Sequence, residues 1–222
     1  MKLKKIASLA LAGIMAVSML AGCSTTGNEE ENNNGENNEV VAASVADYAN
    51  SLLSGAQKNV FEFKNSAELT AAVQKVAGDS EKYTSADIKT TYDHNGFYKS
   101  NDDLAAELKK ELKLDFDNQE TDGLADTDEK GTKTVGFVYD VSGKLTESSA
   151  VQLVIDYFAG ATMSDDTYFP ATIAGAGAAA GLKCDYTAEI SAVKVNAPDT
   201  SKNSSWVVAI VVTQNAVEDA TV

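Results

Sequence analysis

Hydrophobic residues in the first half of the chain recur at the three- and four-residue spacing of amphipathic helices. They predict three helices: one over residues 40–53, one over residues 65–76, and one that starts at Ser100. The second begins with Asn65 and Glu68, a pair typical of a capping box. The third carries aspartates at its start and lysines near its end, an arrangement that suits the helix dipole.

In the second half, hydrophobic and polar residues alternate, which is the pattern of strands with one buried face. Strands are predicted over residues 134–139, 182–195 and 206–213. Turn residues separate the last two, so they predict a long C-terminal β-hairpin. A further hairpin is predicted over residues 88–100, because Asn95-Gly96 favours a type I′ turn.

The run from Ala150 to Phe158 fits both helical and strand periods. Thr146 as an N-cap and Gly160 beyond the last turn favour a helix. Together the patterns predict an α+β fold, with helices mainly in the N-terminal half and an antiparallel sheet mainly in the second. A single domain is expected over residues 40–222.

The first 22 residues have the organisation of an export signal. Lysines occupy positions 2, 4 and 5, an uncharged apolar run covers residues 6–20, and Leu20-Ala21-Gly22-Cys23 follows. This segment resembles the signal peptide and lipobox of bacterial lipoproteins. The resemblance implies cleavage after Gly22 and a diacylglyceryl group on the Cys23 thiol. The alternative is an ordinary secretory signal that contains a cysteine by chance.

The lipoprotein resemblance places the protein on the extracytoplasmic face of the cell membrane, where two acyl chains anchor it stably. After Cys23, residues 24–39 carry no aliphatic or aromatic side chain, which predicts a disordered acidic and Asn-rich tether. Such a tether reaches roughly 20–24 Å on average. The lack of arginine and the use of asparagine and lysine favour an AT-rich genome and a Gram-positive host.

The net charge of −15 excludes one class of partner. Nucleic-acid binding depends on clustered cations that neutralise phosphates, whereas this chain is acidic and all its basic residues are lysines. We therefore expect no nucleic-acid partner. Anionic membrane surfaces repel such a chain too, so the lipid must provide the attachment.

The cysteine and histidine content excludes most zinc sites. If Cys23 is lipidated, Cys184 has no partner for a disulfide, and its place on the apolar side of a strand predicts a buried thiol. His94 is the only histidine and is expected at the exposed turn of the hairpin over residues 88–100. One histidine and one thiol cannot complete a tetrahedral zinc site without several carboxylates.

A dense run of carboxylates between residues 115 and 129 suggests a weak calcium site, because calcium prefers several oxygen ligands on a loop. The candidate ligands are Asp115, Asp117, Asp122, Asp126 and Asp128. The spacing departs from an EF-hand, since Lys130 takes a ligand position and Phe137 stands where the closing glutamate belongs. The alternative is a solvated acidic loop without a cofactor.

Two further motifs match patterns of catalysis or cofactor binding, but neither has the structural context that such a function requires. Ser191 and Lys194 match the S-x-x-K of penicillin-recognising enzymes, but on a strand this spacing puts the two side chains on opposite faces. The glycines at 175 and 177 imitate a dinucleotide loop, but a strand and not a helix is predicted to follow them.

The sequence therefore favours a non-enzymatic binding or structural module of the cell envelope, with an envelope protein or a glycan as partner. One alternative is a hydrolase of cell-wall or glycan polymer that uses a pair of carboxylates, which composition alone does not exclude. Another is a small solute-capture lipoprotein, although the chain is short for two lobes that close on a ligand.

Overall fold

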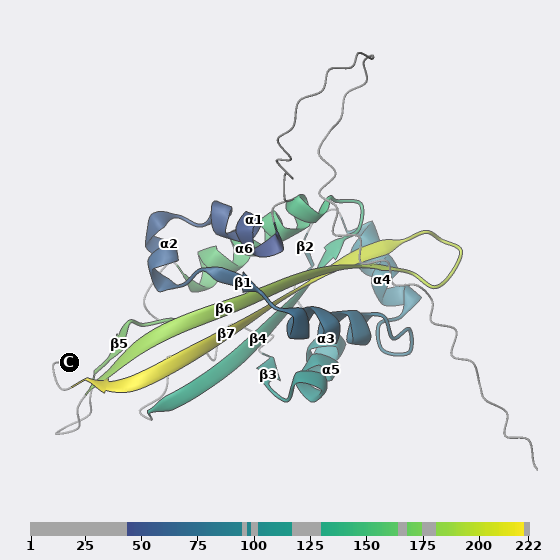
Figure 1. Ribbon diagram of the computed structural model, residues 1–222. Coiled ribbons are helices and arrows are strands. Elements are labelled where there is room, and N and C mark those ends of the chain that lie inside the picture. The colour runs from purple at the N-terminus through teal and green to yellow at the C-terminus, as the bar shows by residue number, and fades with distance from the viewer. Residues whose placement is uncertain are drawn as a thin grey trace, which may run out of the picture.

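The computed structural model describes residues 44–94, 97–98, 102–116, 130–163, 168–174 and 181–219. These residues form one mixed sheet with helices on both of its faces (Figure 1). The arrangement confirms the predicted α+β class.

Three long antiparallel strands form the centre of the sheet and short strands flank them. The strands are β1 Phe63–Asn65, β2 Phe97–Tyr98, β3 Asp115–Phe116, β4 Gly131–Ser142, β5 Thr172–Ile173, β6 Gly181–Asn196 and β7 Ser204–Asp219. The order is β1-β6-β7-β4-β2, with β5 also on the edge of β6 and β3 also on the edge of β4. The parallel pairs β1–β6 and β3–β4 make the sheet mixed.

The predicted C-terminal hairpin is confirmed and is the longest feature of the fold. β6 and β7 pair without interruption from Gly181 opposite Asp219 to Asn196 opposite Ser204. β4 pairs along the other side of β7, so β7 is hydrogen-bonded on both edges for most of its length. This central position explains its nearly continuous hydrophobic run, since both faces of its middle part are buried.

Six helices are present in the described residues: α1 Val45–Leu52, α2 Gly55–Val60, α3 Ala67–Ala77, α4 Ser85–Asp93, α5 Asp102–Leu112 and α6 Glu147–Thr162. The three helices predicted in the first half are confirmed as α1, α3 and α5. The predicted capping box of Asn65 and Glu68 is wrong, because Asn65 ends β1 and Ser66 is the N-cap of α3, where its side chain accepts from the backbone N–H of Leu69. The short α2 was not predicted. Ser54 and Gln57 form a capping box that starts this helix.

The predicted hairpin over residues 88–100 is wrong. Thr84 and Asp87 form a capping box that opens α4, and Ile88 and Thr91 are buried on its inner face. β2 pairs with β4 and not with a preceding strand. The segment predicted as the first strand of the hairpin is therefore part of α4. The Asn-Gly dipeptide itself lies outside the described residues.

The ambiguous run from Ala150 to Phe158 is helical and belongs to α6, with Thr146 as the N-cap. Gly160 lies inside this helix and not beyond its end, which corrects the predicted boundary. The hydrophobic face of α6 packs on the sheet, and this packing outweighs the cost of about 1 kcal/mol of an internal glycine.

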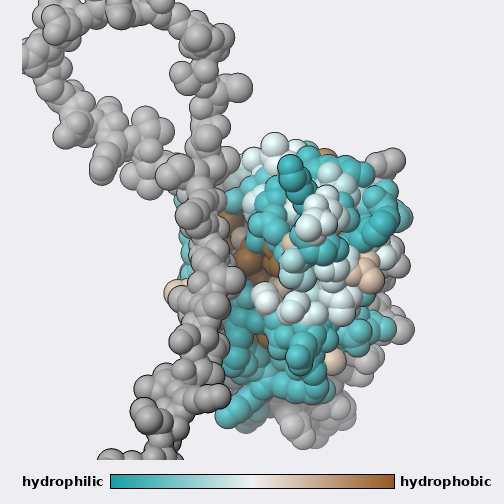
Figure 2. All heavy atoms as spheres, turned by 90° about the vertical axis from the view of Figure 1, so that its right-hand side faces the viewer, coloured by the Kyte–Doolittle hydropathy of each residue, from teal (hydrophilic) through white to brown (hydrophobic). Residues whose placement is uncertain are grey.

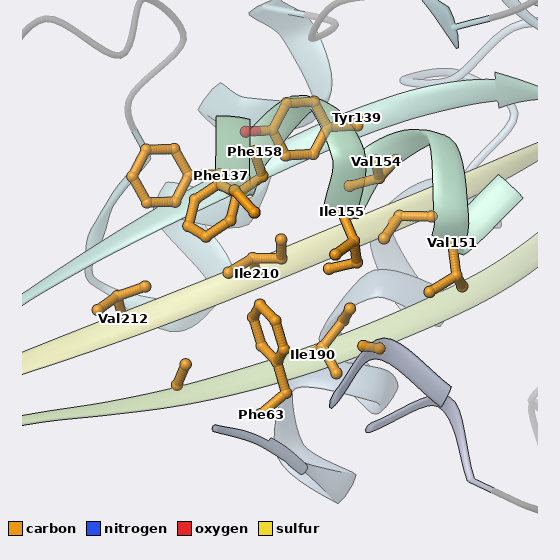
Figure 3. Close-up of a cluster of buried hydrophobic side chains, with 14 of the residues drawn as sticks. Phe63, Phe137, Tyr139, Val151, Val154, Ile155, Phe158, Ile190, Ile210 and Val212 are labelled. Atoms are coloured by element: carbon orange, nitrogen blue, oxygen red, sulfur yellow. The ribbon is translucent and has the colours of Figure 1, made fainter. Parts of the chain in front are cut away.

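The first hydrophobic core lies between the sheet and the layer formed by α1, α2 and α6. Phe158 of α6 is fully buried at its centre. Figure 3 shows side chains of α6 facing Phe137, Ile210 and Ile190 from the three central strands, with Phe63 of β1 beside them. The second core lies on the opposite face, where α3, α4 and α5 cover only one end of the long strands (Figure 1).

Candidate binding surface

A polar cluster is buried between the start of α4 and strands β4 and β7. The Tyr83 hydroxyl donates a hydrogen bond to Ser205 Oγ at 2.8 Å, and Thr91 and Asp140 lie in the same cluster. Burial, and then the charge of Asp140, raise the pKa of Tyr83 far above its usual range, which keeps the phenol protonated. Tyr83 and Asp140 are each 1% exposed, so the cluster has no access to a substrate and serves the fold.

A second polar group lies at the other end of the sheet. The Tyr186 hydroxyl donates to the carbonyl of Pro170 at 2.8 Å and accepts from Gln214 Nε2 at 2.9 Å. These bonds fix the segment around Pro170 against β6. Burial raises the pKa of Tyr186 well above its usual range, so this group is a neutral structural contact.

The structure confirms two interpretations of the reactive residues. Cys184 is buried, and burial is the main cause that raises the pKa of its thiol, so it is unreactive in the folded protein. Ser191 is buried on the face of β6 that carries the second core. Lys194 lies on the other face, where its Nζ atom is 5.4 Å from the centroid of the Trp206 ring. The two residues of the S-x-x-K match therefore cannot act together.

His94 is the C-cap residue of α4 and is exposed, so it does not lie at a hairpin turn as expected. Asp115 is exposed on β3 and forms an ion pair with Lys109. The other calcium candidates, Asp117, Asp122, Asp126 and Asp128, lie outside the described residues. Within the described part of the chain no group of three or more His, Cys, Asp or Glu side chains could hold a metal ion. The weak calcium site stays a prediction.

Cys23 and the tether also lie outside the described residues, and the lipid anchor stays a prediction. No helix in the described part of the chain is long and apolar enough to cross a membrane.

The most distinctive exposed feature of the described residues is a part of the central sheet that no described helix covers, which we call the open face. Figure 1 shows the ends of β4, β6 and β7 that lie near β5 extending past α3 and α5. Its side chains point to the same side as the second core, beyond the reach of those helices. They are Thr132 and Thr134 of β4, Lys183, Asp185, Thr187 and Glu189 of β6, and Thr213, Asn215, Val217 and Asp219 of β7.

The strand register arranges these side chains in rows across the sheet. Thr134, Thr213 and Thr187 form one row, in which the Oγ1 atoms of Thr134 and Thr213 are 3.0 Å apart. The next row consists of Thr132, Asn215 and Asp185. Because all are on one side of the sheet, their hydroxyl, amide and carboxylate groups form a continuous polar surface.

An aromatic ring marks the boundary between the open face and the helices. Phe116 of β3 is half-buried beside Gly136 of β4, and Gly136 lies in the row next to the threonines. A Cβ atom on Gly136 would lie 2.6 Å from Cε1 and Cζ of the Phe116 ring. The glycine is therefore needed for the ring to lie directly on the sheet.

The end of the domain that carries the β6–β7 turn has a different surface from the open face. Figure 2 views this end, and there the visible described residues are mainly hydrophilic around a small hydrophobic recess. Among the described large hydrophobic residues, Val217 on the open face is the exposed one, at 43%. On α4 and α5 the exposed charges form ordinary ion pairs between lysines and acidic residues.

The sequence pattern identified only the β6 part of this surface. The alternation in residues 182–195 put Asp185, Thr187 and Glu189 on the polar side of β6. The contributions of β4 and β7 depend on pairings between distant segments, and the only available signal was the threonine and asparagine at the polar positions of those strands. No family model, curated protein or solved structure matches the chain.

Proposed function

We propose that this protein is a lipid-anchored, non-enzymatic binding protein on the extracytoplasmic face of the cell membrane, and that the open face is its binding surface. The single observation that carries the binding role is the open face itself, a three-stranded surface left bare by helices that cover the rest of the same side.

The anchoring part of the proposal is supported by the N-terminal signal and by Cys23 at the end of the lipobox. A diacylglyceryl group holds a protein at a membrane without a transmembrane helix. The polar segment of residues 24–39 would separate the domain from the lipid headgroups and leave its surfaces accessible to envelope components.

The binding part is supported by the chemistry of the described residues. The carboxylate that is buried, Asp140, lies in the core beside Tyr83, where no substrate reaches it. The open face instead presents exposed polar side chains on three hydrogen-bonded strands, of which β7 is paired on both edges, and this suits recognition because little ordering entropy is lost on binding.

The anchor is tested by substitution of Cys23. Cells that produce the full chain are labelled with a radioactive fatty acid, and the wild-type protein should take up the label and remain with the membrane fraction. Cys23→Ala should abolish labelling and release the protein. A Ser24→Ala variant serves as the control and should behave as the wild type. Labelling that persists in Cys23→Ala would refute lipidation at this residue.

The binding surface is tested by placing a photo-reactive phenylalanine analogue at Thr187 on the open face or at Gln152 on the exposed side of α6. Illumination of cells should give an adduct from position 187 and not from position 152. The same pattern of adducts from both positions, or none from either, would contradict the proposal that the open face is the binding surface.

A further inference from the structure

The open face carries little net charge although the chain as a whole is strongly acidic. Lys183 and Asp185 lie 3.7 Å apart, and Glu189 is next to Lys64 of β1 in the strand register. Lys183 and the neighbouring Lys64 therefore stand against three carboxylates, those of Asp185, Glu189 and Asp219, so the surface carries little net charge in a chain of −15. A polyanion needs clustered cations and a cationic partner needs an acidic patch, so this surface favours an uncharged ligand.

The uncharged groups of the open face are hydrogen-bonding groups. Four threonine hydroxyls and the Asn215 amide both donate and accept, and the Asp185 carboxylate accepts. Neighbouring strands lie about 4.8 Å apart and residues on the same side of a strand about 6.7 Å apart, so these groups repeat at short intervals. A polymer with hydroxyl groups on every unit can bond to several of them at once.

The hydrophobic part of the open face is too small for a typical protein partner. Stable protein interfaces have a desolvated apolar core enriched in aromatic residues. Here the exposed apolar surface consists of Val217, with the half-buried ring of Phe116 at the opposite boundary. Patches of this size instead suit the C–H faces of sugar rings, which pack on aliphatic side chains and on the negative face of an aromatic ring.

From this chemistry we propose that the ligand of the open face is an extended, uncharged glycan chain. The chain crosses β4, β7 and β6, bonds to the threonine row and to Asn215 and Asp185, and contacts Val217 at one boundary and Phe116 at the other. This inference rests on the proposed function, since it names the partner of the same surface.

The test uses full-length protein purified in detergent and three insoluble polymers. They are a β-linked N-acetylglucosamine polymer, cellulose and an insoluble mannan, all of which are uncharged. The protein should sediment with at least one of them. Asn215→Ala and Asp185→Ala should each weaken retention about tenfold, which corresponds to the loss of about 1.4 kcal/mol in hydrogen bonding. Gln152→Ala on α6 is the matched control and should be retained as the wild type.

Gly136→Ala provides an independent variant, because the added methyl group displaces the Phe116 ring and leaves the polar rows in place. We expect weaker retention on the same polymer, and an equal loss for Phe116→Ala. Circular dichroism of each variant shows whether it is folded, and the exposed positions 185 and 215 can change without disturbing the core.

Absence of retention on all three polymers, or equal retention of wild type and open-face variants, would overturn the glycan assignment. A protein adduct of defined mass from position 187, together with failed sedimentation, would leave the binding role intact and replace the glycan by a protein. A concentration-dependent dimer that Asn215→Ala abolishes would replace it by a second copy of this chain.

Discussion

Phe158 connects α6 to the sheet, and its removal should be the most costly single truncation in the first core. The side chain is fully buried, and its ring centroid lies 5.2 Å from that of Phe137, 6.3 Å from those of Phe63 and Phe169, and 6.5 Å from that of Phe61. Truncation to alanine removes these contacts and leaves a cavity that helices and strands on all sides prevent from collapsing.

The expected cost of Phe158→Ala is about 3–5 kcal/mol of unfolding free energy. A domain of this size has a total of about 5–15 kcal/mol, so the variant is folded but marginal. Each kcal/mol lowers the Tm of such a domain by about 2–4 °C, and the predicted decrease is about 6–20 °C. Urea unfolding can be followed by circular dichroism and by the fluorescence of Trp206, the only tryptophan, which lies in the same core.

Phe116→Ala is the control for Phe158→Ala. It removes the same ring from a half-buried position at the boundary of the open face, so a cost below about 2 kcal/mol is expected. If Phe158→Ala costs no more than Phe116→Ala, or less than about 1.5 kcal/mol, the central role of Phe158 in the core is refuted.

Three further predictions concern the titratable groups. Tyr83→Phe removes the buried hydrogen bond to Ser205 and should cost about 1–2 kcal/mol in urea unfolding, whereas Tyr92→Phe, on a half-buried ring, should cost less; equal costs would contradict the role of the cluster. Burial raises the pKa of Glu147, so this group stabilises the fold fully below its ordinary pKa of 4.5, and that contribution is lost as the pH rises through the folded value. Glu147→Gln should therefore gain stability relative to wild type between about pH 4 and pH 7, and a difference independent of pH would refute this. Cys184 should react with a thiol reagent at the rate of global unfolding, and rapid modification of the folded protein would contradict its burial.

The sequence correctly predicted those helices and strands whose own pattern of hydrophobic and polar residues defines one buried face. The leucine stripe of α5 and the alternation of β6 were sufficient, because each amphipathic face has one way to be buried. The same reasoning failed at residues 88–100. There the Asn-Gly turn signal competed with the capping box of Thr84 and Asp87, and burial of Ile88 against the sheet decided in favour of the helix.

The candidate site was less predictable than the fold. The open face exists because α3 and α5 do not reach that end of the strands, and the sequence does not show where along a strand a helix packs. The sequence predicted the polar side of β6. It also contains other polar positions, so polarity alone did not distinguish the open face from the rest of the surface. The threonine row requires residues 134, 187 and 213 to meet across two strand pairings. The sequence indicated no role for Gly136, because its role depends on the Phe116 ring that lies against it in the folded protein.

The sequence by itself determined the α+β class, the long C-terminal hairpin, the acidic and arginine-free composition, and the expectation of a lipid anchor at Cys23. These follow from local periodicity, charge and a contiguous signal. Only the tertiary structure decided that α3 and α5 cover one end of the long strands and leave the other bare. The physical reason is that the position of a helix along a strand depends on packing between segments far apart in the chain, which local patterns do not encode.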